Sequence, residues 1–230
     1  MNTRIGFRCT AVLALVALSA IGILAPPPAD AQDLRLGVKA ALNNGWFSGS
    51  DWTDALDFLA LDPDINSVSN DSRVGFVGGV FVEIPVSPNL SVQPELLIGN
   101  IGGAYTYRAF GINFEGSVTA TALKIPLLLK PKTPVGPDGS LYGLIGPTPA
   151  FLLGDIEYRE RGGGFSISAS EIPDNRFIFT GTLGAGYEHR FDAGAFNMEI
   201  RYNRTFTNIF ENDNTRINSI NIFAGYGFNL

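Results

Sequence analysis

The sequence has few of the residues that build disulfide frameworks and metal sites. Its 230 residues include one cysteine and one histidine. A single cysteine excludes an internal disulfide framework, and a single histidine leaves few routes to a histidine-rich metal site. Charged residues make up 17% of the chain, below the roughly 25% of an ordinary soluble domain. The net charge of −6 argues against a nucleic-acid partner. We expect no cofactor and no metal.

Long apolar runs with helical spacing are also absent from the region beyond residue 31. Apolar residues recur there with a period of two, which is typical of strands. Glycine is abundant instead, with 27 residues, against a usual share of about 7%. These glycines have no three-residue period, which excludes a collagen helix. Hydrophobic residues at 45% are enough to bury a core, so disorder is excluded as well.

The first residues form the pattern of a secretory signal peptide. A short basic start precedes an apolar run over residues 9–25, and small residues precede Gln32 at the −1 position, Ala31, and at −3. An uncleaved membrane anchor is the alternative, but three consecutive prolines after the run favour cleavage between Ala31 and Gln32. We therefore predict two parts: a signal peptide, 1–31, and a β domain, 32–230.

The period-two pattern divides the β domain into eight segments. We expect strands at Leu34–Asn43, Val74–Ile84, Leu90–Gly99, Thr119–Lys130, Leu141–Leu152, Phe177–Arg190, Phe196–Thr207 and Asn218–Leu230. Most of them reach the roughly 9–11 residues that a tilted strand needs to cross a bilayer.

The connections between these segments alternate in length. Short or turn-rich ones are Pro85–Asn89, Pro131–Gly139 and Phe191–Gly194; mostly longer, polar ones are Asn44–Arg73, Asn100–Val118, Gly154–Arg176 and Asn208–Ile217. Short turns at one rim and long loops at the other are typical of outer-membrane barrels. The predicted fold is all-β: an eight-stranded antiparallel up-and-down transmembrane β-barrel of the outer-membrane kind.

Alternation along single strands indicates which side faces lipid. In the fourth segment Leu123, Ile125 and Leu127 lie on one face, with Lys124 and Lys130 on the other. A soluble periplasmic β-barrel that binds a small apolar ligand would point these aliphatic side chains inward, whereas a transmembrane barrel points them to lipid. Aromatic residues near predicted strand ends resemble interfacial girdles, which favours the membrane.

The inward face then carries charges of both signs. Buried charges survive only when they are paired, so we predict a structural charge network in the lumen made of Arg35, Lys39, Glu83, Glu95, Lys124, Glu188, Arg190, Glu199 and Arg201. If the third and fourth strands pair symmetrically about Ala109–Phe110, Glu95 faces Lys124. Prolines inside predicted strands lack a ladder donor, so we expect bulges at Pro94, Pro126, Pro147 and Pro149.

Several ordered motifs resemble a known family. The chain is similar to PorT-like bacterial outer-membrane β-barrel proteins at Leu36–Lys39, Val92–Leu97, Leu123–Lys130, Leu144–Pro147, Arg201–Tyr202, Thr207–Ile209 and Phe223–Phe228. The resemblance covers nearly the whole β domain. It implies an eight-stranded barrel in the outer membrane of a diderm bacterium. It implies little about activity, although some members of the family are linked to protein secretion.

Residues with catalytic chemistry are few. Outer-membrane lipid-modifying enzymes use a histidine base with a serine and an acidic residue. The single histidine, His189, precedes a predicted periplasmic turn, and Glu188 beside it points to the opposite face. The first long loop is rich in aspartate, which suits calcium, but it lacks EF-hand spacing, so a solvated loop is favoured.

We therefore predict a non-enzymatic integral outer-membrane barrel with a plugged polar lumen, whose role is structural or is binding through its extracellular loops. The expected partners are outer-membrane lipid and lipopolysaccharide, the barrel-assembly machinery during biogenesis, and an extracellular or secretion partner. A lipid-modifying enzyme, a narrow pore and a soluble periplasmic barrel remain alternatives.

Overall fold

A computed structural model describes residues 34–173, 175–207 and 214–230. These ranges contain one helix and eleven strands: β1 (Arg35–Ser48), α2 (Ser50–Ala60), β2 (Ile65–Asp71), β3 (Arg73–Ser87), β4 (Leu90–Ala109), β5 (Ile112–Lys124), β6 (Leu127–Val135), β7 (Gly139–Gly162), β8 (Phe165–Glu171), β9 (Phe177–Phe191), β10 (Gly194–Thr205) and β11 (Arg216–Asn229). The predicted signal peptide and its Ala31–Gln32 cleavage site lie outside them. No helix within these ranges is long and apolar enough to span a membrane.

The strands form one antiparallel sheet that closes on itself. The first and last strands, β1 and β11, pair over their whole length, from Arg35 opposite Asn229 to Ser48 opposite Arg216. Beside this seam, the backbone N–H of Leu230 donates to the carbonyl of Leu34 at 3.0 Å. From β1 the ring continues to β3 and then β4. From β11 it continues to β10, β9 and β7.

The structure has eleven strands where the sequence predicts eight, because three positions around the ring hold two segments each. β5 and β6 both lie between β4 and β7. β2 continues β3 along the same side of β4, and β8 continues β9 along the same side of β7. The divisions occur at Ser72, at Ile125–Pro126 and at residues 172–176.

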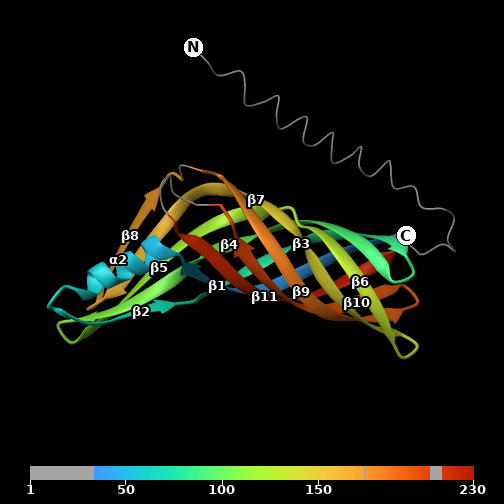
Figure 1. The fold of residues 1–230 in the computed structure, drawn as a ribbon, viewed down its shortest axis with the longest axis horizontal. Helices are drawn as coiled ribbons and strands as arrows, with labels where there is room; N and C mark the ends of the chain where they lie inside the picture. The colour runs from blue at the N-terminus through green and yellow to red at the C-terminus, as the bar shows by residue number, and fades with distance from the viewer. Residues whose placement is uncertain (1–33, 174, 208–213) are drawn as a thin grey trace, which may run out of the picture. The chain divides into compact units, whose positions relative to one another are not determined.

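The long connections at one end are more regular than the sequence suggests. β4, β5 and β7 continue well beyond their predicted ends, so the expected loops over 100–118 and 154–176 are mostly hairpins. Within the expected polar connection Asn44–Arg73, the chain forms the eleven-residue helix α2. Figure 1 shows α2, β2 and β8 gathered at this end of the barrel, opposite the short turns. Polar and apolar residues alternate along a strand when one face contacts lipid or an apolar core and the other does not. The strand extensions at this end alternate less clearly, so the sequence did not identify them as strands.

The register between β4 and β5 corrects the predicted Glu95–Lys124 pair. Lys124 lies opposite Leu97, because the hairpin is centred on Phe110–Gly111 and not on Ala109–Phe110. Both turn residues have positive φ, 52° and 77°, as a two-residue primed turn requires. Glycine supplies one such position at little cost, and this places the turn one residue later than predicted.

Bulges were also expected at the four strand prolines, and here the prediction is wrong. Pro94 lies where the β3–β4 pairing has a gap, and Pro147 and Pro149 face the break between β5 and β6 at Pro126. The register is the same on both sides of each gap, so no residue is inserted. Two hydrogen bonds span the β5–β6 break, from Glu95 N–H to Pro126 at 2.9 Å and from Ile125 N–H to Pro149 at 2.8 Å. Each proline therefore removes a backbone hydrogen bond between neighbouring strands but leaves their register unchanged.

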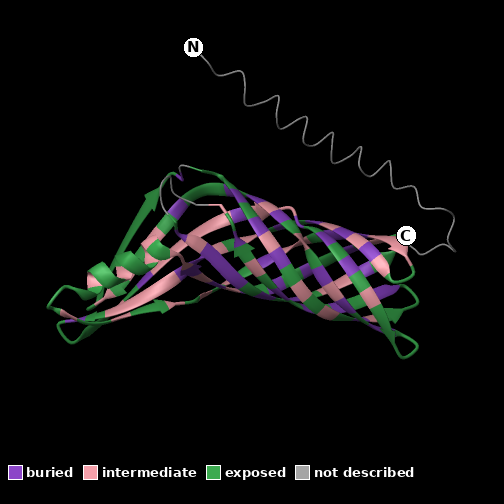
Figure 2. Cartoon of the chain, in the orientation of Figure 1, coloured by how far each residue is buried: buried purple, intermediate pink, exposed green. Residues whose placement is uncertain are grey.

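Around the barrel, apolar side chains point outward and polar ones inward. Figure 2 shows burial alternating along the strands of the ring, whereas β8 is exposed throughout. Leu127 is 44% exposed, whereas Lys130 on the same strand is buried, which is the reverse of a soluble barrel. Exposed aromatic side chains lie near both barrel ends, Tyr187, Phe191, Phe196 and Phe228 at one and Phe151, Phe177, Phe179 and Phe206 at the other. This is the surface of a barrel that meets lipid between two aromatic belts.

Candidate functional site: the charged lumen and the extracellular wall

The lumen is filled by layers of side chains. Each layer contains one inward-facing residue of β1. From the short turns upward these are Arg35, Lys39, Ala41, Asn43 and Phe47. Two charged layers come first, then a small apolar layer, an amide layer and an apolar layer. Because side chains on a strand alternate, each layer draws one residue from each of several neighbouring strands.

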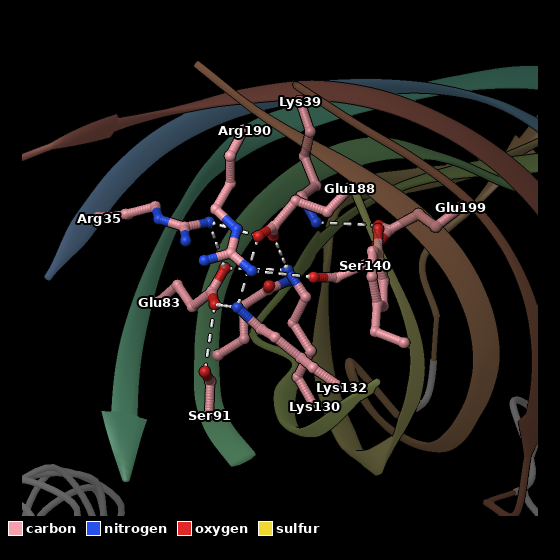
Figure 3. Close-up of polar contacts among 12 residues, drawn as sticks. Arg35, Lys39, Glu83, Ser91, Lys130, Lys132, Ser140, Glu188, Arg190 and Glu199 are labelled. Atoms are coloured by element: carbon pink, nitrogen blue, oxygen red, sulfur yellow. Dashed lines mark hydrogen bonds and ion pairs between the residues drawn. The ribbon is translucent and has the colours of Figure 1, made fainter. Parts of the chain in front are cut away.

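The first charged layer, which we call the rim cluster, lies near the short turns (Figure 3). Lys130 Nζ lies 2.9 Å from carboxylate oxygens of both Glu83 and Glu188. Arg35 lies 2.7 Å from Glu188 and 3.8 Å from Glu83, and Lys132 contacts both glutamates. Three cations thus share two carboxylates, and Ser91 donates a further hydrogen bond to Glu83 at 3.1 Å. The cluster has a net charge of +1.

The second layer, which we call the central cluster, is neutral and almost fully enclosed. Arg201 donates two hydrogen bonds of 2.7 Å to the two oxygens of Glu95, and it lies 2.5 Å from Glu199. Lys39 Nζ lies 2.8 Å from Glu95 and 2.9 Å from Glu199. The four side chains come from β1, β4 and β10. A bidentate arginine–carboxylate pair is directional as well as strong, so it holds these strands in one register.

Aromatic rings enclose both clusters. Lys39 Nζ lies 4.6 Å from the ring centre of Phe81, and the Arg201 guanidinium lies 4.5 Å from that of Phe223. Tyr142 contacts both clusters, because its hydroxyl donates to Glu199 at 2.9 Å and its ring lies 4.2 Å from Lys130 Nζ. Gly186 makes room for that ring, since a Cβ there would lie 2.4 Å from it. The rings exclude water and add cation–π attraction.

Above the charges, an amide and hydroxyl belt crosses the lumen. Asn221 donates to Asn43, Asn203 donates to Asn221, and Thr182 donates to Asn203 at 2.7 Å. Next comes an apolar cap of packed side chains: Phe47, Ala122, Ala150, Leu152, Ile156, Ile178 and Ile217. A cavity of about 20 Å³ remains within this cap, room for about one water molecule.

Seven of the nine side chains predicted to lie in the lumen network form these two clusters. Lys124 and Arg190 do not, within the described ranges: Lys124 has no carboxylate partner, and Arg190 donates to Ser140 at 3.2 Å. The predicted network missed two lysines of the rim cluster. Lys130 was placed on the inward face but left out of the network, and Lys132 lies two residues later on that same face. The prediction also missed Tyr142, because nothing in the sequence distinguishes a tyrosine that points into the lumen from one that points to lipid.

The single histidine lies away from both clusters. His189 packs against Phe191 with ring centres 4.8 Å apart, and its Nδ1 is 3.4 Å from the Tyr187 hydroxyl. These neighbours are exposed aromatics of the outer surface near the short turns. Glu188, next in sequence, points into the rim cluster instead. Among the residues that the structure describes, His189 forms no ion pair, so no carboxylate is seen to orient it as a general base.

At the opposite end, five strands rise beyond the ring as an extracellular wall: β2, β4, β5, β7 and β8. On its inner face the hydroxyls of Tyr107 and Tyr105 donate to Glu160, at 2.7 Å and 3.4 Å. Burial and then this carboxylate raise the pKa of Tyr107 to about 12. Trp52 of α2 continues the row of rings, 5.9 Å from Tyr105.

The acidic first loop is partly structured and shows no metal centre. Its aspartates cap turns and pair with hydroxyls; Asp62 accepts the backbone N–H of Asp64 at 2.9 Å, and Asp71 accepts Ser69 at 3.0 Å. No group of three or more His, Cys, Asp or Glu side chains with metal-site geometry exists among the described residues.

Comparison with known proteins identifies the family. Residues 30–211 match the model for the outer membrane protein beta-barrel domain. The chain belongs to that family. It therefore lies in the outer membrane of a Gram-negative bacterium, as the sequence predicts. The match concerns the broad family, and the narrower PorT-like resemblance stays a prediction. No curated protein matches the chain.

Three solved outer-membrane proteins are similar to this chain at low identity. OprG from Pseudomonas aeruginosa is 13% identical, with 86% of this chain and 98% of that chain covered and a TM-score of 0.43. Ail of Yersinia pestis is 12% identical, with 86% and 100% covered and a TM-score of 0.39. Neisserial surface protein A is 12% identical, with 85% and 97% covered and a TM-score of 0.39.

Proposed function

We propose that the protein is a non-enzymatic barrel whose closed lumen serves as structure and whose extracellular wall serves in binding. Eight ring positions cross the membrane, three of them built from two strand segments. The supporting observation is the filling of the lumen: two ion-pair clusters, an amide belt and an apolar cap follow one another along its length. A barrel of this size has an interior that side chains can fill.

The charge network supports a structural role for the lumen more than a transport role. The four carboxylates of the two clusters are engaged by two or more cations each, so a passing cation finds no free carboxylate there. Separating such buried ion pairs is costly, because each partner loses its counter-charge in a water-poor interior. The apolar cap adds a second barrier, which a hydrated ion crosses only if the cap opens. These features argue against the narrow-pore alternative.

Catalysis finds no support at the one histidine. His189 lies at the short-turn end and faces outward among aromatic rings. A lipid-modifying triad needs a serine and an acid converging on the histidine. In the described part of the chain, the contacts of His189 are with the aromatic side chains of Tyr187 and Phe191. The PorT-like resemblance and a link to secretion remain predictions from the sequence motifs.

Conductance in a planar bilayer tests the closed lumen. The wild-type protein should insert, show heat-modifiable gel mobility and carry no steady current. As a positive control, a variant with the cap reduced, Phe47→Ala with Leu152→Ala and Ile156→Ala, should show brief openings. A stable single-channel current from the wild type would overturn the proposal.

A further inference from the structure

The barrel wall has an unpaired stretch between β3 and β4 at its extracellular end. Pairing of β3 with β4 ends at Val77 opposite Gly99, and pairing of β2 with β4 begins at Asp71 opposite Ala104. In between, residues 73–76 pair only with β1 and residues 100–103 pair only with β5. The wall therefore opens here over four residues on each side.

The conformation of β4 keeps this gap open. Gly102 has a φ of 145°, and its carbonyl approaches β1 so closely that a Cβ on Gly45 would lie 2.4 Å from it. Asn43 of β1 donates its amide to the carbonyl of Asn100 at 3.0 Å. β4 thus leans toward β1 and away from the upper part of β3.

Two cavities meet at this gap, and Arg73 lines both. The lower one, about 200 Å³, includes Val74, Phe76 and Ile101 in its lining. The upper one, about 340 Å³, lies against the extracellular wall and includes Arg159 and Arg161. The lower cavity is thus partly apolar and the upper one cationic, and Arg73 lies between them. We call the two cavities together the groove.

The upper cavity offers donors to an anion. Arg73 Nη1 is buried and has no hydrogen-bond partner among the described residues. Arg159 and Arg161 alternate along the same face of β7. Two carboxylates also line the cavity, but Asp71 already accepts hydrogen bonds from Ser69 and Thr106. With Glu115 counted, three cations face two anions.

The groove also lies at the edge of the lipid-facing surface. Val74 and Phe76 are 63% and 69% exposed on the barrel exterior. Arg73 precedes them on β3 and points to the opposite face of the strand, beside the gap, where it lines both cavities. Acyl chains contact the apolar surface, so the lipid headgroups lie at the level of Arg73. Arginine pairs well with phosphate through its planar set of donors.

We infer that this groove binds the phosphate-bearing headgroup of an outer-leaflet lipid, with an acyl chain along Val74 and Phe76. Arg73, Arg159 and Arg161 hold the phosphate, and the hydroxyls of Thr106 and Ser117 lie within the same lining. This inference deepens the binding role proposed above and rests on it. It assigns the ligand class to one place on the wall.

The test measures lipid binding to the purified full-length barrel in detergent by native mass spectrometry. The probes are diphosphorylated lipid A, the same lipid with its phosphates removed, and inorganic phosphate. We expect lipid A to bind, and the Arg73→Gln and Arg161→Gln variants to bind it about tenfold more weakly each, since each loses a charged hydrogen bond. Arg108→Gln is the matched control: Arg108 is exposed on the same wall but lies outside the groove.

Three results would overturn the inference. These are equal binding of the dephosphorylated lipid, displacement of lipid A by millimolar inorganic phosphate alone, and an Arg108→Gln loss equal to that of Arg161→Gln. Heat-modifiable mobility of each variant verifies folding, and a misfolded variant is replaced by Ser117→Ala, for which a weaker loss is expected. Because the bilayer current is measured separately, a conducting wild type would overturn the closed lumen without changing these lipid results.

Discussion

Charges inside the barrel and charges on the extracellular wall have opposite surroundings. In the lumen, Arg201 is buried and makes three short contacts with two glutamates. On the wall, Arg159 is exposed, and its ion pair with Glu157 is long, at 4.0 Å. A buried ion pair adds register and strand specificity, whereas an exposed pair adds little stability. The same residue types therefore organise the lumen inside the barrel and present a charged surface on the extracellular wall.

The largest effect should come from breaking the central cluster. Arg201→Met leaves Glu95 and Glu199 with Lys39 alone, and an uncompensated buried charge costs about 3–5 kcal/mol. Urea unfolding in lipid vesicles, followed by gel mobility, measures this loss. Lys124→Met is the matched control, since Lys124 has no carboxylate partner in the described ranges, and it should change stability by less than about 1 kcal/mol. Equal losses in both variants would contradict the role of pairing.

A charge on the outer surface sharpens the contrast between lipid and water. Ile200 is 53% exposed midway along β10, so Ile200→Lys should cost about 2–4 kcal/mol in the same assay. Ile167 is exposed on β8 of the wall, and Ile167→Lys should be close to neutral. If both substitutions were neutral, the surface around Ile200 would not face lipid.

A crowded lumen glycine should give the next largest effect. Gly186→Ala places a Cβ 2.4 Å from the Tyr142 ring, which forces the ring away from Glu199 and costs about 1–3 kcal/mol. Gly136→Ala, in an exposed turn with open space around its Cβ position, reports the cost of a positive φ alone. A smaller loss for Gly186→Ala than for this control would contradict the packing argument.

The smallest effect should be on the wall, and it depends on pH. The pKa of Tyr107 is raised to about 12 by burial and by Glu160, above the ordinary value of about 10. Its contribution to stability is therefore complete below pH ~10 and is lost as the pH rises through about 12. Ultraviolet titration of the phenolate should show this late ionisation. Glu160→Gln should move it to lower pH, and an unchanged titration would contradict the hydrogen bond.

Much of the barrel follows from alternation in the sequence. The positions of Lys39, Glu95, Glu199 and Arg201 are predictable because a period of two assigns each strand residue to one face. Their grouping was not predictable, since it depends on register between strands far apart in the chain. The hairpin at Phe110–Gly111 shows how sensitive this is: moving the centre by one residue changed the partner of Lys124 from Glu95 to Leu97.

The extracellular wall was the least predictable region. Both faces of β8 are exposed, so polar and apolar residues need not alternate along it and its sequence has no strand pattern. The gap beside β3 was invisible for a related reason. It results from the backbone bend at Gly102 and from pairing that stops and restarts, and neither has a signature in side-chain pattern.

The seam between β1 and β11 has a consequence for the time course of biogenesis. Arg35 and Asn229 meet across it although almost the whole described chain separates them. Contacts of such long sequence separation are slow to form. Until they form, the first and last strands expose unpaired backbone groups, which lipid cannot satisfy. Pairing of β1 with β11 is therefore expected last during insertion. Until then, the unpaired backbone groups of both edge strands need other hydrogen-bond partners.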